Sequence, residues 1–285
     1  IPVCLLGVFE FSRALQTAGR RIDVVPQLVV GAGATLWGDD QHFPWSIGFQ
    51  PSYQAETAVY AKYVLTNKPD AKIALFYQND DAGKDYGNGF KKGLGPDNTA
   101  KMVVAEATYE STDPTVDSQI VKLKASGANV LFMHAIPKQA AQAIKKIGEI
   151  GWKPDMFFLA ATSTSVSSVL KPAGFEHSKG IISSYSLKDP NDPQWKDDPD
   201  VIALKTFMKD YFPDGNLQDQ LIVYGYVVAE ATVQVLKQCG DDLTHENIMK
   251  QAANLDIALP MFLPGIKVKT SPTDYFPVEA MRLQK

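Results

Sequence analysis

Short apolar runs alternate with amphipathic segments along most of this chain. The apolar runs have strand length and are mostly apolar at every position, which is typical of parallel strands covered by helices on both faces. We therefore predict six strands, at Val24–Val30, Lys72–Tyr77, Met102–Thr108, Asn129–Ala135, Met156–Ala161 and Gly180–Ser186.

Between the strands, apolar residues recur every three or four positions, as on the buried face of a helix. The pattern predicts helices at Tyr53–Asn67, Tyr86–Leu94, Val116–Ser126, Lys138–Ile150, Val201–Tyr211, Asp219–Gln238 and Glu246–Leu255. The residues expected on buried faces include Ala55, Val59 and Tyr63; Tyr86, Phe90 and Leu94; Val116, Ile120, Val121 and Leu123; Ala140, Ile144 and Ile147; and Val201, Leu204, Met208 and Tyr211. This alternation predicts an α/β fold with a parallel sheet and right-handed crossovers.

Two segments depart from the strand–helix rhythm. Lys188–Asp200 is rich in Pro and Asp, which indicates an exposed connection. Gly265–Leu283 alternates weakly and carries turn signals at Ser271–Asp274, so we predict a β-hairpin that closes the sheet.

Length and charge narrow the class of protein. The 285 residues fit one large α/β domain or two lobes of ordinary size. A formal charge of −4, without a stripe of Lys and Arg, argues against a nucleic-acid partner. No apolar run approaches the roughly 18 residues of a membrane span. The first residues lack the basic leader and cleavage site of a signal peptide. The chain also lacks an initiating Met, so we expect a processed product or a piece of a longer protein.

The chain carries no catalytic or metal-binding signature. G-x-S-x-G is absent, and His42, His134, His177 and His245 are scattered without metal-ligand spacing. We interpret His134, at the end of a predicted strand, as a satisfied structural residue. The adjacent carboxylates Asp80–Asp81 and Asp197–Asp198 are expected to be solvated, and calcium at Asp189, Asp192, Asp197 and Asp198 is disfavoured because no ordered ligand spacing is visible. We therefore predict no cofactor, no metal and no enzymatic activity.

Two cysteines, Cys4 and Cys239, are too few for a disulfide framework. Two isolated or buried thiols are favoured, and a long-range disulfide between them cannot be argued from their spacing.

Two glycine-containing turns invite a nucleotide-binding interpretation that their spacing disfavours. After Gly31–Thr35 the sixth position of the dinucleotide fingerprint, where glycine lets helix and strand pack closely, is Leu36. Gly83–Asp85 resembles the end of a phosphate-binding loop, but the required earlier glycine is Gln78. We interpret Gly31–Thr35 as a turn whose small residues let a ligand approach backbone N–H groups, with Thr35 adding a hydroxyl.

Small or polar residues follow four of the predicted strands. They are Gly33–Thr35, Asp80–Ala82, His134–Ile136 and Thr162–Thr164. Ligands of open α/β sheets bind outside the carboxyl ends of the strands. These four loops are therefore candidate ligand contacts.

Five segments that together span most of residues 24–285 carry a resemblance to a known family: GATLWGDDQHFPWSIGFQPSYQAE, KIALFYQNDDAGKDYGNGFKKGL, YESTDPTVDSQIVKLKASGANVLF, GWKPD and VYGYVVAEATVQVLKQCGDDLTHENIMKQA. As a set they resemble the solute-binding proteins of ABC transporters for branched-chain amino acids and related solutes, which have the type I periplasmic-binding-protein fold. It implies two α/β lobes that close on a small-molecule ligand, joined by three crossovers near Phe49–Pro51, Ser183–Leu187 and the C-terminal hairpin. It also implies a periplasmic monomer that performs no chemistry and delivers its solute to membrane permease and ATPase subunits.

The resemblance implies ligand-binding positions in both lobes. The carboxylate site of the family, built from backbone and hydroxyl groups, corresponds to Gly33, Ala34 and Thr35. Gln50 and Tyr185, which lie beside two of the expected crossovers, are further candidates.

Four candidate positions depart from the amino-acid binders of the family. Ala82 stands where those proteins place an aromatic residue, and Ala135 or Ile136 replaces their aromatic residue near the next strand end. Their ammonium-binding acid falls at about Thr162, within an uncharged run. Because an ammonium buried without a carboxylate partner is costly, the ligand is expected to keep a carboxylate or other acceptor but to lack an α-amine. An aromatic or short organic acid is the first choice, and an amide or urea-like solute the next.

The lobes are expected to divide the chain into a partial N-terminal lobe (1–50), a C-terminal lobe (51–184), a return to the first lobe (185–264) and a hinge-associated hairpin (265–285). Residues 1–23 match the family poorly, so the first lobe is expected to be incomplete and ligand binding to be weak or absent. Two other functions stay open: a ligand-sensing regulatory domain of the same fold, and an α/β enzyme with a nucleotide or small-acid substrate.

Overall fold

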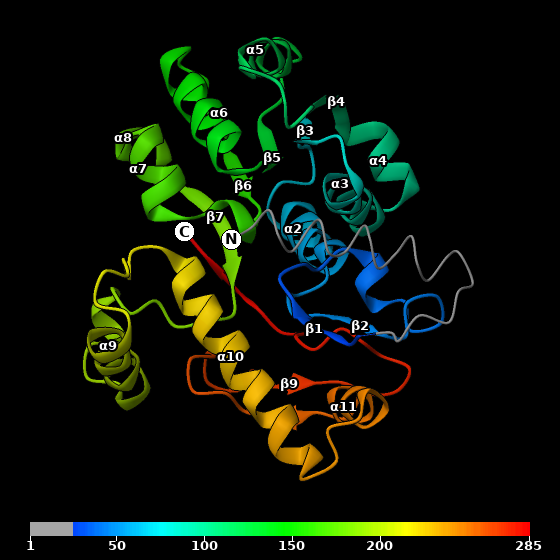
Figure 1. Cartoon of the computed structure of the whole chain (residues 1–285). Coiled ribbons are helices and arrows are strands. Elements are labelled where there is room, and N and C mark those ends of the chain that lie inside the picture. Colours follow the sequence, from blue (N-terminus) through cyan, green and yellow to red (C-terminus); the bar gives the residue numbers. More distant parts are fainter. Residues whose placement is uncertain (1–24) are drawn as a thin grey trace. The chain divides into compact units, whose positions relative to one another are not determined.

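The computed structural model describes residues 25–285, which form two compact units (Figure 1). The first unit contains the described residues up to Ser52 together with Tyr226–Ala280, and the second contains Tyr53–Gly225 and Met281–Lys285. The chain therefore passes between the units three times, as expected for the predicted fold class. The expectations for residues 1–23, including Cys4, lie outside the described residues.

A six-stranded sheet forms the centre of the second unit, with the strand order β10-β7-β6-β5-β3-β4. Its strands are β3 (Ile73–Gln78), β4 (Val103–Tyr109), β5 (Val130–His134), β6 (Met156–Leu159), β7 (Ile181–Tyr185) and β10 (Arg282–Gln284). Neighbouring strands from β3 to β7 pair in parallel, whereas β10 pairs antiparallel with β7 at the edge. The five parallel strands lie within two residues of their predicted bounds.

Helices cover both faces of this sheet. They are α2 (Tyr53–Asn67), α3 (Asp81–Leu94), α4 (Pro96–Met102), α5 (Asp117–Ala125), α6 (Pro137–Glu149), α7 (Lys171–Ala173), α8 (Phe175–Ser178) and α9 (Pro199–Tyr211), with the shorter turns η2 (Ala161–Ser163), η3 (Val166–Leu170) and η4 (Pro193–Trp195). On one face the rings of Tyr60 and Phe90, from α2 and α3, pack on Phe132 with centroids 6.2 and 5.5 Å apart. On the other face, side chains of α5 and α6 share a core with Leu131 and Met133. Alternation along β5 thus builds two cores.

The first unit has a smaller framework. Its elements are β1 (Gln27–Val30), η1 (Thr35–Gly38), β2 (Ser46–Gly48), α11 (His245–Ala252), β8 (Asp256–Ile257), β9 (Val268–Lys269) and the greater part of α10 (Gln220–Cys239). β1 and β2 pair in parallel, and β8 and β9 pair antiparallel. Its core includes Phe49, whose ring packs edge-on against Phe262 with centroids 6.4 Å apart. Cys239 is buried and free.

The buried face predicted for α2 is wrong. Glu56, Thr57 and Tyr60 are buried instead, at 2%, 0% and 0% exposure. Polar residues can occupy this face because their groups are hydrogen-bonded; the Thr57 hydroxyl, for example, donates to the Tyr53 carbonyl at 3.0 Å. The residues predicted to be buried there, Ala55, Val59 and Tyr63, are exposed.

The other helix faces follow the apolar pattern with two exceptions. Val121 is 48% exposed because it is adjacent in sequence to the fully buried Ile120, and neighbouring helix residues point about 100° apart. Tyr211 is 75% exposed at the last residue of α9. The buried residues of α3 and α6 are those predicted, Tyr86, Phe90, Leu94, Ala140, Ile144 and Ile147.

The predicted hairpin at Gly265–Leu283 does not form. Val268–Lys269 pairs with the earlier strand Asp256–Ile257, and Arg282–Gln284 pairs with β7. Only an isolated bridge joins Ser271 and Asp274 within the predicted turn. Each half of the segment therefore has its partner elsewhere, although β10 does extend the sheet as expected.

The predicted exposed connection, Lys188–Asp200, is organised around a buried lysine. Lys188 Nζ lies 2.9 Å from Asp198 Oδ2 and 2.8 Å from Asp200 Oδ2. Asp198 also accepts hydrogen bonds from the backbone N–H groups of Asp200 and Val201 at the start of α9. Asp198 is therefore a paired capping residue, whereas its neighbour Asp197 is 88% exposed.

Residues 185–225 group with the second unit, whereas the sequence predicts their return to the first lobe. One hydrogen bond ties the segment to the loop that follows β6: the Thr164 hydroxyl donates to Gln220 Oε1 at 3.2 Å. A second holds the segment together, since Asn191 Nδ2 donates to the Leu217 carbonyl at 2.8 Å.

Candidate functional site

The carboxyl ends of the parallel strands of the second unit gather at one edge of its sheet. Asp80 follows β3, Ala135 follows β5 and Thr162 follows β6, in the order in which β3, β5 and β6 neighbour one another. This edge is where parallel α/β sheets bind ligands.

Glu56 lies beneath this edge and links three segments. Its Oε1 accepts hydrogen bonds from the Tyr60 hydroxyl at 2.6 Å and from the Ala161 N–H at 2.8 Å. Tyr60 Oη in turn accepts the N–H of Ser184 at 2.8 Å. One carboxyl group on α2 therefore fixes the turn after β6 and, through Tyr60, the end of β7.

Burial raises the pKa of the Glu56 carboxyl, while the hydrogen bonds from Tyr60 and Ala161 act in the opposite direction. Burial likewise raises the pKa values of the phenols of Tyr60 and Tyr86, so both keep their hydroxyl protons at neutral pH. The network is thus a buried acid that is surrounded by neutral donors.

A chain of hydrogen bonds leads from Glu56 to the loops after β5 and β6. Tyr86 Oη lies 3.5 Å from Glu56 Oε2 and 3.2 Å from Thr162 Oγ1. Thr162 Oγ1 lies 3.4 Å from His134 Nδ1. The side chains of this hydrogen-bond chain also stack. The Tyr86 ring lies between two others, with its centroid 4.3 Å from that of Tyr53 and 4.4 Å from that of His134.

His134 is only 7% exposed, and its imidazole is held neutral. Burial lowers the pKa of His134 to about 4, although the Asp80 carboxylate acts in the opposite direction. A neutral imidazole has one N–H donor and one acceptor nitrogen. His134 and Thr162 therefore present neutral imidazole and hydroxyl groups, with the Asp80 carboxylate at the same edge.

Further hydrogen bonds fix the loop after β5. The Ser163 hydroxyl donates to the Ala135 carbonyl at 2.7 Å and accepts the Ala135 N–H at 3.2 Å. Tyr109 Oη accepts the Ile136 N–H at 2.9 Å and donates to Gln78 Oε1 at 3.0 Å. The loops after β5 and β6 thus hold each other in place.

The predicted contacts of the second unit occupy different positions along this edge. Ala82 is the second residue of α3, where Asp80 caps the helix by accepting the Gly83 N–H at 2.8 Å. Ala135 is buried, whereas Ile136 is 37% exposed at the start of α6. The structure brings Ala135 and the Thr162 loop together through Ser163. Tyr185 ends β7, opposite Arg282 of β10.

The predicted contacts of the first unit lie in two segments. Gly33 and Ala34 are buried between β1 and η1, and Thr35 begins η1. Gln50 follows β2 by two residues. Trp37 of η1 lies close to Gly48, where an added Cβ would come within 2.9 Å of the Trp37 Cβ.

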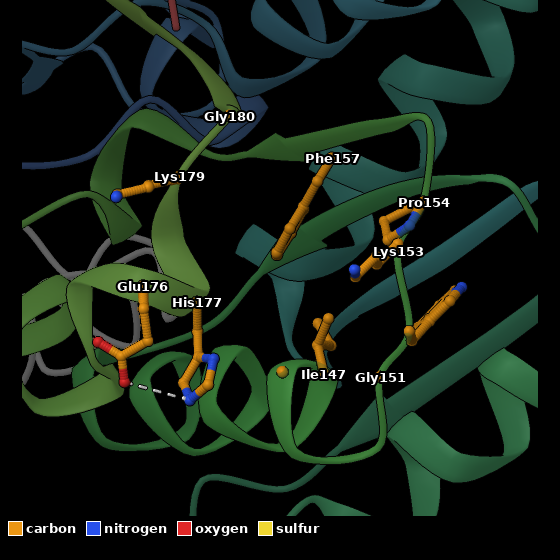
Figure 2. Close-up of a pocket in the computed structure, with 11 residues that line it drawn as sticks. Ile147, Gly151, Lys153, Pro154, Phe157, Glu176, His177, Lys179 and Gly180 are labelled. Carbon is orange, nitrogen blue, oxygen red and sulfur yellow. Dashed lines mark ion pairs between the residues drawn. The ribbon is translucent and has the colours of Figure 1, made fainter.

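A cavity of about 310 Å³ lies at the opposite, amino-terminal ends of β6 and β7. Its lining includes Phe157 and the side chains of Lys153 and His177, which lie on opposite sides of Phe157 (Figure 2). His177 Nε2 lies 3.4 Å from Glu176 Oε1, and this carboxylate is 72% exposed. The charged groups here are surface groups, in contrast to the hydrogen-bonded network of the carboxyl edge.

The sequence analysis missed Glu56, Tyr60 and Tyr86 as site residues and took His134 as structural. One signal was present: Glu56 and Tyr60 are four positions apart on a predicted helix and face the same way. Nothing in the sequence indicates that Glu56 accepts a hydrogen bond from the N–H of Ala161, which is 105 residues away.

Neither a metal-binding cluster nor a membrane-spanning helix is found in the described part of the chain. Residues 25–285 contain no cluster of three or more His, Cys, Asp or Glu side chains that could hold a metal ion. Nor does this range contain a helix that is both long and apolar enough to cross a membrane.

Comparison with known proteins identifies the class. A family model described as periplasmic binding protein matches residues 8–285, and the chain belongs to this family. Among curated protein sequences no match was found.

Solved structures share the fold. A substrate-binding periplasmic protein from Ralstonia solanacearum is 20% identical with a TM-score of 0.76, the match covering 90% of this chain and 69% of that one. A branched-chain amino acid ABC transporter protein from Thermus thermophilus with bound valine is 15% identical with a TM-score of 0.77, covering 98% and 71%. A solute-binding protein of an ABC transporter from R. palustris in complex with 4-hydroxybenzoate is 16% identical with a TM-score of 0.75, covering 96% and 71%.

Proposed function

We propose that this chain is the extracytoplasmic solute-binding component of an ABC importer and that it captures a small carboxylate-bearing solute. An aromatic or other organic acid is favoured over an amino acid. The chain would act in the periplasm as a monomer, deliver the solute to permease and ATPase subunits, and perform no chemistry on it.

One observation carries the choice of solute: among the described residues, the groups joined to Thr162 are neutral, and the Asp80 carboxylate at the same edge is engaged as the cap of α3. Glu56 is the nearest acid in the hydrogen-bond chain, and it is 2% exposed and engaged by Tyr60 and Ala161. An α-ammonium group beside Thr162 would be desolvated without a carboxylate free to pair with it, which is unfavourable. A carboxylate or hydroxyl oxygen is compatible with the same groups.

The similar structures support a carboxylate ligand, since both valine and 4-hydroxybenzoate carry one. In the first unit we retain Gly33, Ala34 and Thr35 as the proposed carboxylate-binding turn, with Gln50 as a further contact. In the second unit the proposed contacts are Ala82, Ala135, Ile136, Thr162 and Tyr185.

Calorimetry and ligand-induced melting shifts test this proposal. Benzoate and 4-hydroxybenzoate, titrated to millimolar concentration, are expected to bind and to raise the melting temperature, because a ligand that binds only the folded state stabilises it. Leucine is expected to give neither response. Tight binding of leucine without binding of the aromatic acids would overturn the proposed solute class.

A further inference from the structure

We propose that the cavity at the amino-terminal ends of β6 and β7 is a second small-molecule site, which holds a small aromatic carboxylate against an apolar floor through the ammonium groups of Lys153 and Lys179. The cavity lies at the edge of the sheet opposite to the carboxyl ends, so it is separate from the proposed solute site. This inference goes beyond the proposed function and does not rest on it.

Apolar side chains form the floor of the cavity. Ile147, Trp152 and Phe157 line it, and they are 3%, 7% and 7% exposed because they also belong to the core between the sheet and α6. The Trp152 indole is fixed further, since its Nε1–H donates to the Ala128 carbonyl at 3.2 Å. Aromatic rings pack favourably on other rings. The floor is therefore preformed and suits a flat apolar body.

Glycines shape the wall that the end of α6 contributes. An added Cβ at Gly148 would lie 2.1 Å from His177 Nδ1, so the missing side chain lets this imidazole pack against the helix. Gly151, with a φ of 62°, lets the chain turn from α6 toward Trp152. The cavity of about 310 Å³ is near the lower end of the range for ligand pockets, which indicates a small ligand.

The acceptors around the cavity are already in use, which disfavours a cationic ligand. The carbonyl groups of Lys146, Ile147 and Gly148 accept N–H groups of the residues that follow α6, each at 3.0 Å. The Glu176 carboxylate is 72% exposed, and its Oε1 lies 3.4 Å from His177 Nε2. A cation in the cavity would have to compete with His177 for this carboxylate.

Two lysines supply charge of the opposite sign. Lys153 and Lys179 line the cavity, and Figure 2 shows them on opposite sides of Phe157. Within residues 25–285 neither lysine forms a hydrogen bond or an ion pair. Their flexible stems can lie along an apolar surface while the ammonium groups reach an anion. With two ammonium groups and one carboxylate in its lining, the cavity favours an anion.

A matched pair of ligands separates charge from shape. The anion is 2-naphthoate, and its neutral isostere is 2-naphthamide. Binding is followed by NMR through the indole N–H signal of Trp152, which is assigned with Trp152→Phe. The backbone amide signals of Ala135 and Thr162 report the carboxyl edge in the same spectra, so the two sites are distinguished.

We expect 2-naphthoate to shift the Trp152 signal with a dissociation constant below about 1 mM, and 2-naphthamide to bind at least about tenfold more weakly. Raising the salt concentration from about 20 to about 500 mM should weaken the binding of 2-naphthoate, because salt screens exposed charges. Lys153→Met and Lys179→Met should each weaken it by about three- to fivefold. The double variant should bind the two ligands equally.

Lys122→Met is the control variant, since Lys122 is an exposed lysine of α5 outside the cavity lining, and its affinity for 2-naphthoate should match the wild type. Equal affinities of the wild type for 2-naphthoate and 2-naphthamide would overturn the proposal. So would an unchanged affinity of the double variant for 2-naphthoate, or shifts confined to Ala135 and Thr162. If a lysine variant fails to fold, the wild type still decides, because binding that is independent of salt refutes the role of the two ammonium groups.

Discussion

The second unit buries a carboxyl group, on Glu56, and an ammonium group, on Lys188, and stabilises them in opposite ways. Glu56 is 2% exposed and is hydrogen-bonded to neutral groups, the Tyr60 hydroxyl and the Ala161 N–H. The Lys188 side chain is 6% exposed and lies between two carboxylates, with the Trp195 ring centroid 5.5 Å from its Nζ. Burial raises the pKa of Glu56, whereas the pKa of Lys188 is also raised because its carboxylate partners outweigh the effect of burial.

The two arrangements also differ in the sequence separation between the buried residue and its partners. Glu56 and Ala161 are 105 residues apart, and Tyr60 and Ser184 are 124 apart. The partners of Lys188 are only 10 and 12 residues away. Glu56 therefore couples α2 to the carboxyl ends of β6 and β7, where the solute is proposed to bind, while Lys188 organises one local connection.

The largest effect is expected from Glu56→Ala. It removes the acceptor of the Tyr60 and Ala161 donors and leaves a cavity, so the free energy of unfolding should fall by about 3–5 kcal/mol. Urea unfolding measures this loss. Glu56→Gln, which keeps one carbonyl oxygen, should cost less than about 1.5 kcal/mol. Similar stabilities of the two variants would show that hydrogen bonding by Glu56 is not what holds this edge.

The next largest effect is expected from His134, which should make the free energy of unfolding depend on pH. Its folded pKa of about 4 lies below its ordinary value of 6.5, so the unfolded state binds more protons between these values. Stability should therefore decrease as pH falls from about 6.5 to 4, by about 3 kcal/mol from this group. The groups that face it are the Asp80 carboxylate, the rings of Tyr53 and Tyr86, and the Thr162 hydroxyl.

Urea unfolding of the wild type and His134→Phe at pH 7, 6, 5 and 4 isolates this contribution, because every titratable group except His134 is present in both proteins. The difference between the two unfolding free energies should shift by about 3 kcal/mol across the series. Parallel pH dependences would mean that His134 is not desolvated in the folded protein.

The same contrast explains what the sequence could predict. Strands such as β3 and β5 were located because continuous apolar runs are a local property. The bounds of α2 were also predicted, yet its buried face was wrong, because Glu56 and Tyr60 are buried through partners more than 90 residues away. Thr162 was identified from its place after a strand, but its link to His134 depends on the pairing of β5 with β6.

Lys188→Met should have the smallest of the three effects, about 2 kcal/mol, because Asp200 is 38% exposed and water can solvate it once the lysine is removed. A matched control is Lys145→Met, which removes an exposed pair whose Lys145 Nζ and Glu149 Oε1 are 3.9 Å apart. The control should cost less than about 0.5 kcal/mol. Equal costs would show that the buried pair contributes no more than a surface one.

Hydrogen exchange can show whether the effect of Lys188→Met is local. Asp198 accepts the N–H groups of Asp200 and Val201, so these two amides should exchange faster when its lysine partner is lost. The Ala161 and Ser184 amides, which depend on the Glu56 network, should be unchanged. In Glu56→Ala the pattern should reverse. If either variant accelerates exchange at both sets of amides, the two buried charges belong to one cooperative unit, and the distinction between a local and a long-range arrangement fails.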